Sequence, residues 1–379
     1  MRRLCPSPWL RRIAAPANLW AAWRTVRQRR GGPGVDGVTI AAFAAREADH
    51  LRRLEQQLLA HTYAPSALKR VTLAKRHGRQ RQIGVPCVAD RVVQQAMLRV
   101  LGPHFEPTFG DCNYGFRTGR NAHQAVQAVV KLLRMGLTWV VETDIEAFFD
   151  TLDWPRLRGA LAAEMPDEAV LDLIHRFVHA GGFSGAGIAN RGVPQGTGCS
   201  PLLANVYLTG FDRTMASQGG GFVRYGDDMV SLHRSRRAAT AALGNMRQCL
   251  EGDLHLRLHP GKTRIIQARR QGFDFLSFRF THTALEPSPD ALQRFQSRVA
   301  GLVGQTHGQS PEARAEALNP LIRGWGEYFK IADVNGLYRE LDAWLWSLLQ
   351  LDPQAAPGHS PSLASLVAIK HRYTQSGQP

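Results

Sequence analysis

The chain has 379 residues, 44% hydrophobic and 21% charged, with a formal net charge of +16. This ordinary globular composition excludes collagen, low-complexity disorder and a small disulfide scaffold, and the length predicts two or three lobes. The five cysteines are scattered and form no Cys-x-x-Cys pair, which argues against a disulfide framework or a zinc knuckle.

No segment predicts export or a membrane span. The longest stretch without a charged side chain, residues 192–211, is interrupted by Pro194, Gln195 and Pro201, and no apolar segment follows the N-terminal arginines. We therefore expect a cytoplasmic protein without a membrane partner.

The positive charge is concentrated at the N-terminal end. Residues 1–81 hold 17 Lys and Arg against 4 Asp and Glu, whereas the remaining residues hold 30 against 27. A basic first lobe beside a nearly neutral remainder indicates that a polyanion is gripped at one side. A generally basic surface, as in an Arg-favouring genome, explains the charge almost as well, so charge alone favours nucleic acid only modestly.

Periodicity and turn residues predict helices and strands in alternation. The expected elements, in chain order, are helices over 9–30 and 39–60, a hairpin over 70–85 that turns at 77–79, a helix over 90–101, a strand over 137–141, a helix over 167–179, a helix from a Ser200 cap with Pro201 at its first position to 211, a strand–turn–strand over 222–232, and a strand over 273–280. Such a mixture, with some strands in hairpins, indicates an α+β fold.

The C-terminal third is predicted to be helical. Pro287 and Pro289 mark a boundary, and beyond it Leu337, Leu341, Leu345 and Leu348 form a stripe at helical spacing. Residues 291–350 are therefore expected to form a helical lobe. The segment 351–379 is rich in Pro, Gly and Ser, and we expect a partly disordered tail.

The strongest local signal is Tyr225-Gly226-Asp227-Asp228, which is flanked by Phe222-Val223 and Met229-Val230. This pattern predicts two adjacent carboxylates at a hairpin tip, where like charges repel and a divalent cation, Mg²⁺ or Mn²⁺, relieves the repulsion. Taken alone, a Gly-Asp-Asp tripeptide is more often an ordinary Asp-rich turn.

A second acidic segment supplies a third carboxylate. Residues 140–150 run from a predicted strand into Asp144 and then into paired aromatic residues. Three carboxylates from two segments suit a two-metal phosphoryl transfer, in which one metal activates a 3′-hydroxyl and the other holds the triphosphate. From the pattern alone, Glu142, Glu146 and Asp150 compete with Asp144 for this role.

The chain resembles the bacterial group II intron reverse transcriptases and their relatives over roughly residues 19–350. The resemblance is carried by collinear motifs: Gly34-Val-Asp-Gly37; Lys75-Arg-His-Gly-Arg-Gln-Arg81 before Ile83-Gly-Val-Pro86; Asp90-Arg-Val-Val-Gln-Gln95; Tyr114-Gly-Phe-Arg-Thr-Gly-Arg-Asn-Ala-His123; Asp144-Ile-Glu-Ala-Phe-Phe-Asp150; Arg191-Gly-Val-Pro-Gln-Gly196 with Ser200-Pro-Leu-Leu-Ala-Asn205; Tyr225-Gly-Asp-Asp228; His259-Pro-Gly-Lys-Thr263; Phe275-Leu276; and Gly324-Trp325 with Tyr328-Phe329.

The resemblance implies a right-hand polymerase with fingers, palm and thumb. The expected domains are a basic helical extension (1–33), fingers (34–135), a palm with an antiparallel sheet packed by helices (136–283), an all-helical thumb (291–350) and the tail (351–379). Because neither a nuclease segment nor a ribonuclease H-sized segment follows the thumb, we expect a reverse transcriptase that lacks both activities.

The resemblance also implies residue roles. Asp144, Asp227 and Asp228 are then the catalytic carboxylates for two Mg²⁺ ions, or Mn²⁺ in their place. Asp144 and Asp227 bind metal directly, the Ile145 carbonyl is an extra ligand, and Asp228 is a supporting charge.

For the incoming dNTP, the resemblance places Lys75 and Arg81 on the triphosphate and Gln195 on the nucleotide and template. Phe149 stacks under the sugar and excludes a 2′-hydroxyl, while Phe148 fills the core. Without the order of the motifs, Lys75 and Arg81 would be read equally well as solvated surface charge.

The expected macromolecular partners are an RNA template, a DNA or RNA primer and a cognate structured RNA. Lys262 is expected near the primer end. The residues expected on the template backbone, as aromatic and Arg side chains are in single-strand binders, are Tyr114, Phe116, Arg117 and Arg120.

Three departures from the family pattern remove no catalytic group: Gly226 stands where Ala is common, Gln82 where Pro is common, and Ser277 where Gly is common. Three alternative functions stay open. The first alternative is an intron maturase with incidental polymerisation. The second is a relative co-opted by its host for phage defence or CRISPR spacer acquisition, and the third is an RNA-directed RNA polymerase. Phe149 argues against the last.

Overall fold

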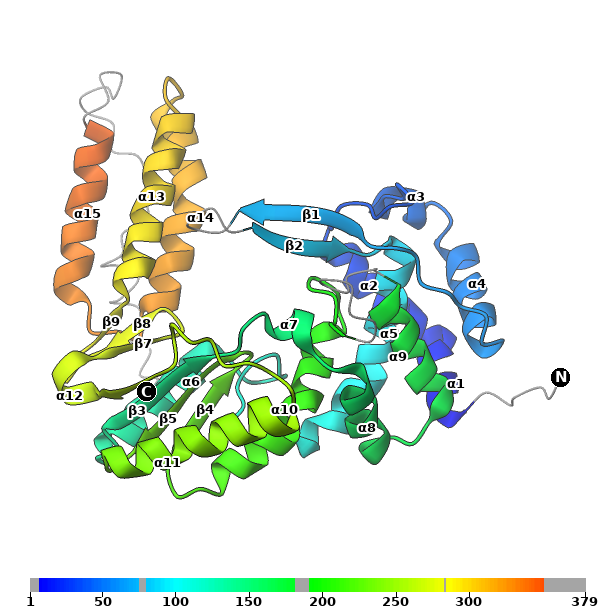
Figure 1. Ribbon diagram of the computed structural model, residues 1–379. Helices are drawn as coiled ribbons and strands as arrows, with labels where there is room; N and C mark the ends of the chain where they lie inside the picture. Colours follow the sequence, from blue (N-terminus) through cyan, green and yellow to red (C-terminus); the bar gives the residue numbers. More distant parts are fainter. Residues whose placement is uncertain (1–6, 75–79, 181–190, 283, 351–379) are drawn as a thin grey trace. The chain divides into compact units, whose positions relative to one another are not determined.

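The computed structural model describes residues 7–74, 80–180, 191–282 and 284–350 (Figure 1). Three predictions fall outside these residues: the role of Lys75, the turn at 77–79 and the disorder of the tail 351–379.

The N-terminal segment forms two helices where one was predicted over 9–30. Helix α1 (Pro8–Ala14) ends at Ala15, whose extended backbone (ψ 131°) precedes Pro16, the first residue of α2 (Pro16–Gln28). Proline has no N–H to continue the helix and disfavours helical backbone in the residue before it. The prediction of a single helix was therefore wrong, although the apolar residues keep their helical spacing across the break.

The second predicted helix, over 39–60, is also divided. Helix α3 (Ile40–Ala44) is capped by the Thr39 hydroxyl, and α4 (Glu47–Leu59) starts after Arg46 leaves helical geometry at φ −135°. Helices α1, α2 and α4 pack on α5 (Val88–Phe105), which was predicted over 90–101.

The predicted hairpin over 70–85 is confirmed. Strand β1 (Lys69–Ala74) pairs antiparallel with β2 (Gln80–Val85), so that Lys69 lies opposite Val85 and Leu73 opposite Arg81.

The central sheet has the strand order β4-β5-β3-β6. Its strands are β3 (Trp139–Asp144), β4 (Gly221–Tyr225), β5 (Asp228–His233) and β6 (Arg264–Gln267). The strand predicted over 137–141 and the strand–turn–strand over 222–232 are confirmed, and β3 pairs antiparallel with β6.

Helix α10 (Ser200–Ala216) packs on β4, and 12 of its 17 residues are buried. Its cap was predicted wrongly. Cys199 occupies the cap position and Ser200 is already helical, because the Ser200 hydroxyl donates to the Pro194 carbonyl at 2.6 Å and does not cap the helix. The other helices are α6 (Ala122–Arg134), α7 (Phe148–Thr151), α8 (Trp154–Glu164), α9 (Glu168–His179), α11 (Arg236–Arg247) and α12 (Ala268–Gln271).

The strand predicted over 273–280 is a hairpin. Strands β7 (Phe273–Phe275), β8 (Phe278–Phe280) and β9 (Leu285–Pro287) form an antiparallel sheet. Leu276 (φ 50°) and Ser277 (φ 66°) form the β7–β8 turn, since two consecutive positive φ angles reverse a chain within two residues.

The helical character predicted for the segment 291–350 is confirmed by α13 (Pro289–Gln305), α14 (Pro311–Phe329) and α15 (Asn335–Gln350) (Figure 1). Trp325 lies at its centre, with ring centroids 4.6 Å from Phe295 and 5.9 Å from Tyr338. In the predicted leucine stripe Leu341 and Leu345 are buried, whereas Leu337 and Leu348 are only half-buried.

The chain divides into two compact units. One comprises 1–121, 143–229 and 240–263, and the other comprises 122–142, 230–239 and 264–379. Strands β3 and β5 each run from one unit into the other. The fold is mixed α and β with antiparallel pairing, as predicted from the sequence.

Candidate active site

Asp144 is the last residue of β3 and is fixed by the loop that precedes β6. The Asp144 carbonyl accepts a hydrogen bond from the His259 N–H at 2.8 Å, and the Glu146 N–H donates to the Arg257 carbonyl at 2.8 Å. An antiparallel bridge between Ile145 and Leu258 lies between these two bonds. The position of Asp144 is therefore set by backbone contacts on both sides of it.

The same loop brings Lys262 to Asp144. The Lys262 ammonium donates to the Asp144 carboxylate, and the two side chains are 59% and 21% exposed. An ion pair this open to solvent contributes only about 0–1 kcal/mol, so a divalent cation can displace the lysine at small cost. The prediction that Lys262 lies near the primer end remains a prediction, because the described residues show only its contact with Asp144.

Asp227 and Asp228 lie at the turn between β4 and β5. Gly226 adopts φ 70°, a conformation that glycine enters without strain and that lets the chain reverse here. Both aspartates are half-buried, and β5 is the neighbour of β3 in the sheet. Asp228, the first residue of β5, and Asp144, the last of β3, are thus on adjacent strands.

The three carboxylates have the right chemistry for a hard divalent cation, which takes oxygen ligands. Within the described ranges, however, no three His, Cys, Asp or Glu side chains are arranged so that they could hold a metal ion. The donors are present at adjacent strand ends and accessible to solvent, and the structure does not gather them around one point.

The competing acidic residues have partners of their own. Glu142 faces Arg264 across the β3–β6 pair, where the guanidinium Nε donates to Glu142 at 2.8 Å. Burial raises the pKa of Glu142, and the hydrogen bond from Arg264 opposes that shift. Glu146 lies 3.7 Å from Arg257. Glu142 therefore has a cross-strand structural role, and Asp144 is the carboxylate at the strand end.

Three predicted nucleotide contacts lie on segments that the backbone ties together. The Gln195 carbonyl accepts from the Gly84 N–H of β2 at 2.8 Å, and the Phe149 carbonyl accepts from the Val193 N–H at 2.7 Å. The Gln195 amide donates weakly to Asp150 at 3.4 Å. Phe148 is buried, as predicted, and Phe149 is half-exposed. Arg81 belongs to β2, so that the segments of Arg81, Phe149 and Gln195 meet.

Of the predicted template residues, Tyr114 and Phe116 contact the segment of the turn, since the Tyr114 N–H donates to the Arg224 carbonyl at 2.8 Å. Phe116 is 49% exposed and its ring centroid lies 6.2 Å from that of Tyr225. The Arg120 guanidinium lies 5.2 Å from the Tyr114 ring centroid. Both arginines have partners within the chain: Arg120 donates to Asp111 at 2.7 Å, and Arg117 donates to Glu106 at 2.8 Å and to the Gly110 carbonyl at 2.6 Å. Template binding by these residues therefore remains a prediction.

Sequence reasoning missed residues that carry no catalytic group. A Cβ on Gly115 would lie 2.3 Å from the backbone N of Gly226, so only glycine lets this segment approach the acidic turn. Arg224 is fully buried although charged. A charged residue inside the apolar stretch from Phe222 to Tyr225 was the available signal.

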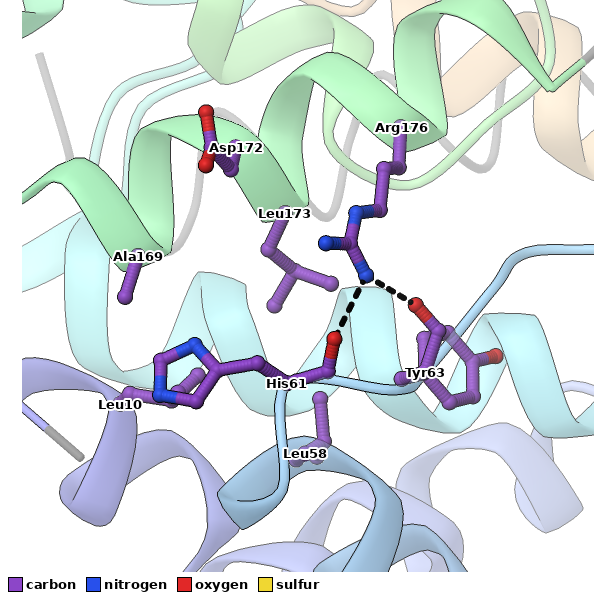
Figure 2. Close-up of a pocket in the computed structure, with 8 residues that line it drawn as sticks. All are labelled: Leu10, Leu58, His61, Tyr63, Ala169, Asp172, Leu173 and Arg176. Atoms are coloured by element: carbon purple, nitrogen blue, oxygen red, sulfur yellow. Dashed lines mark hydrogen bonds between the residues drawn. The ribbon is translucent and has the colours of Figure 1, made fainter. Parts of the chain in front are cut away.

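A small pocket in the first unit is lined by residues outside the predicted site. It has a volume of about 30 Å³, room for about one water molecule, and is lined by Leu10, Leu58, His61, Tyr63, Ala169, Asp172, Leu173 and Arg176 (Figure 2). The Arg176 guanidinium donates to the carbonyls of His61 and Tyr63, each at 2.9 Å, and so ties α9 to the end of α4. None of these residues belongs to the predicted site.

The sheet thus carries Asp144 at the end of one strand and the Asp227-Asp228 turn at the start of the adjacent strand. The family model described as "Reverse transcriptase (RNA-dependent DNA polymerase)" matches residues 73–280, and "Group II intron, maturase-specific domain" matches 292–351. The chain belongs to the reverse transcriptase family, of group II intron type, and is an RNA-directed DNA polymerase.

Two relatives agree with this family. Protein YkfC of Escherichia coli is 33% identical over 71% of this chain and 82% of its own length. The group II intron-encoded protein LtrA of Lactococcus lactis is 29% identical over 54% of this chain, which spans only 34% of LtrA. Among solved structures, a partial Cas6-RT-Cas1–Cas2 complex has 24% identity and a TM-score of 0.38, covering 64% of this chain and 42% of that one.

Reverse transcriptases use divalent metal ions, and the matched domains imply binding to an RNA template. Among the helices of the described residues, none combines the length and the apolar character that crossing a membrane requires.

Proposed function

We propose that this chain extends the 3′-hydroxyl of a DNA or RNA primer with dNTPs on an RNA template, using Asp144, Asp227 and Asp228 as its metal-binding carboxylates. The observation that carries the proposal is the position of Asp144 and Asp228 at the ends of adjacent strands within the segment that matches the family model.

Mg²⁺ is the proposed metal, with Mn²⁺ as a substitute, and two ions are expected. Asp144 and Asp227 would bind it directly, with the Ile145 carbonyl as a further ligand and Asp228 as a supporting charge. A divalent metal held there would supply the charge that lowers the pKa of the attacking hydroxyl and neutralises the leaving pyrophosphate. Lys262, which donates to the Asp144 carboxylate, would have to release it for a cation to be held there.

The chain's own residues select and position the nucleotide. Lys75 and Arg81 bind the triphosphate, Lys as a point charge and Arg as a fork. Phe149 lies under the sugar and leaves no room for a 2′-hydroxyl, which makes dNTPs the substrate class. Its half-exposed ring and the bond from Val193 to its carbonyl support that placement.

Tyr114, Phe116, Arg117 and Arg120 bind the template backbone in this proposal, with Lys262 at the primer end. The exposed ring of Phe116 supports this assignment, because aromatic rings stack on bases of any sequence. We propose that the maturase-specific domain binds a structured RNA, and that the protein acts in the cytoplasm, where the cysteines at 87, 112, 199 and 249 stay reduced.

The test is primer extension on an RNA template with dNTPs and Mg²⁺. We expect Asp227→Ala combined with Asp228→Ala to lower the rate about a thousandfold or more, as when catalytic groups that act as a unit are removed. The matched control removes two exposed aspartates elsewhere, Asp49→Ala with Asp172→Ala, and should keep the wild-type rate. Extension that survives in the first variant would refute the assignment of the site.

A further inference from the structure

A buried ion pair lies directly behind the acidic turn. Arg224 in β4 and Asp212 in α10 are both fully buried, and the guanidinium grips the carboxylate with two bonds: Nε to Oδ1 at 2.7 Å and Nη2 to Oδ2 at 2.5 Å. Two opposite charges in such a position are stable only when every donor has a partner. The remaining guanidinium nitrogen must therefore also be bound.

That nitrogen reaches the turn itself. Arg224 Nη1 donates to the Gly226 carbonyl at 2.9 Å and to Asn205 Oδ1 at 3.2 Å. The Asn205 amide in turn donates to the Gly115 carbonyl at 2.9 Å. Asn205 and Asp212 are seven residues apart on α10 and so lie on one face of that helix. Two side chains on one face of α10 thus bind the Arg224 guanidinium, which in turn binds the Gly226 carbonyl of the turn.

The backbone of Arg224 is fixed as well. Its N–H donates to the Cys112 carbonyl and its carbonyl accepts from the Tyr114 N–H, both at 2.8 Å. A planar guanidinium group with five donors in a fixed fork can bind a carboxylate and a carbonyl at once in a set geometry, whereas a lysine ammonium offers three rotatable donors on one nitrogen. The network therefore fixes the Gly226 peptide relative to α10.

We propose that Arg224 is a positioning residue for polymerisation: by holding the Gly226 carbonyl, it sets the direction in which Asp227 and Asp228 leave the turn. Asp212 and Asn205 act through it. This inference rests on the proposed function only insofar as the two aspartates serve catalysis, because the restraint on the turn is a property of the folded chain.

The test separates the restraint from overall stability. The double variant Arg224→Met with Asp212→Leu replaces the buried pair by apolar side chains of similar volume, an exchange that is often neutral for folding. It leaves the Gly226 carbonyl without its donor. A second variant, Arg224→Lys, keeps an ion pair with Asp212 and loses the fork. The matched control is Arg158→Met with Glu168→Leu, which removes an exposed ion pair between α8 and α9.

Three measurements are made on the full chain. Hydrogen exchange of the peptide containing residues 225–228 should be about tenfold faster in both Arg224 variants, since a released turn opens locally. Mn²⁺ binding, followed by the paramagnetic resonance of the free ion, should weaken. In primer extension kcat should fall about tenfold to a hundredfold while the KM for dNTP stays nearly constant, as expected for misplaced catalytic groups. The control should match the wild type in all three.

The outcomes distinguish the two proposals. Unchanged exchange of the turn in both variants overturns the positioning role, whatever the activity. Faster exchange with unchanged kcat also overturns it, because the restraint would not serve catalysis. A wild-type chain that extends no primer defeats the proposed function. If the Arg224 variants then show weaker Mn²⁺ binding and faster exchange of the turn, Arg224 still positions Asp227 and Asp228.

Discussion

Asp90 in α5 combines a carboxylate with nearly complete burial. It is 3% exposed, and it accepts hydrogen bonds from the Tyr63 hydroxyl at 2.5 Å and from the Ser66 N–H at 3.2 Å. Desolvation raises the pKa of Asp90 to about 6, although both hydrogen bonds act to lower it. The folded state therefore holds this proton more tightly than the unfolded chain does.

The stability that Asp90 contributes is therefore fully present below its unfolded pKa, near 4, and is lost as the pH rises through about 6. Asp90→Asn cannot ionise. Between pH 5 and pH 8 the wild type loses the contribution of Asp90 and the variant does not. The free energy of unfolding of the variant minus that of the wild type should therefore increase by on the order of 1 kcal/mol from pH 5 to pH 8. Urea unfolding at both pH values measures this. Asp49→Asn, at an exposed position, is the control, and a difference that is equal at the two pH values would contradict the prediction.

At the scale of single residues, the candidate catalytic residues could be predicted from the sequence, whereas the residues that position them could not. Asp144, Asp227 and Asp228 stand in patterns that stay recognisable without a structure. The partners of Arg224 do not, because Asn205 and Asp212 look like ordinary polar positions until the fold brings α10 behind β4. The contact of Lys262 with Asp144 was equally hidden, since 118 residues separate them.

The β7–β8 turn carries strain that one substitution can remove. Ser277 adopts φ 66°, and a side chain in that region costs about 1 kcal/mol or more relative to glycine. The Ser277 hydroxyl accepts an exposed hydrogen bond from Arg294 at 3.1 Å, which recovers only part of that cost. Ser277→Gly should therefore stabilise the protein by about 0.5–1 kcal/mol, raising Tm by a few degrees at most.

Thermal and urea unfolding test this, with Arg294→Ala as the control that removes the hydrogen bond and keeps the strained residue. A lower stability of Ser277→Gly than of Arg294→Ala would show that the hydroxyl matters more than the backbone geometry.

Elements were predicted well wherever a local signal accompanied them. The β1–β2 hairpin, the β4–β5 pair and the helical lobe follow from period and turn residues. The β7–β8 turn was missed because a two-residue hairpin turn with two positive φ angles usually has Asn, Asp or Gly at the positions that Leu276 and Ser277 occupy. The break at Pro16 was missed because the apolar period continues through it, although Pro16 itself was a sufficient signal.

The uneven charge of the whole chain predicts how RNA binding depends on salt. Arg24, Arg29 and Arg30 are exposed in and directly after α2, within the basic first 81 residues. Because binding to phosphates releases counterions, the affinity for a labelled RNA should fall linearly on a log–log plot against KCl concentration. Changing these three arginines to Gln should reduce the slope by about 1 for each phosphate that the variant no longer neutralises.

Fluorescence anisotropy across a KCl series measures this slope. The matched control changes three exposed arginines outside the basic segment, Arg234, Arg237 and Arg247, to Gln. If both triple variants show the same slope of log affinity against log KCl concentration, the N-terminal arginines do not form the RNA-binding surface.

At the scale of the whole molecule, composition and motif order predicted the class of fold and the family. They did not predict the division into units, because contacts between distant segments have no local signature. The boundary within β3, between residues 142 and 143, falls in the middle of a strand that any sequence pattern would keep whole.

The interleaving of the two units has a consequence for synthesis on the ribosome. The first unit lacks its final segment until residue 263 has been translated, more than a hundred residues after its first segment ends at 121. At about 5–20 residues per second, the first unit therefore stays incomplete for on the order of 10 s after its first segment has been synthesised. Chaperones that shield nascent chains should therefore affect the yield of this protein more than that of a polymerase whose units follow one another along the chain.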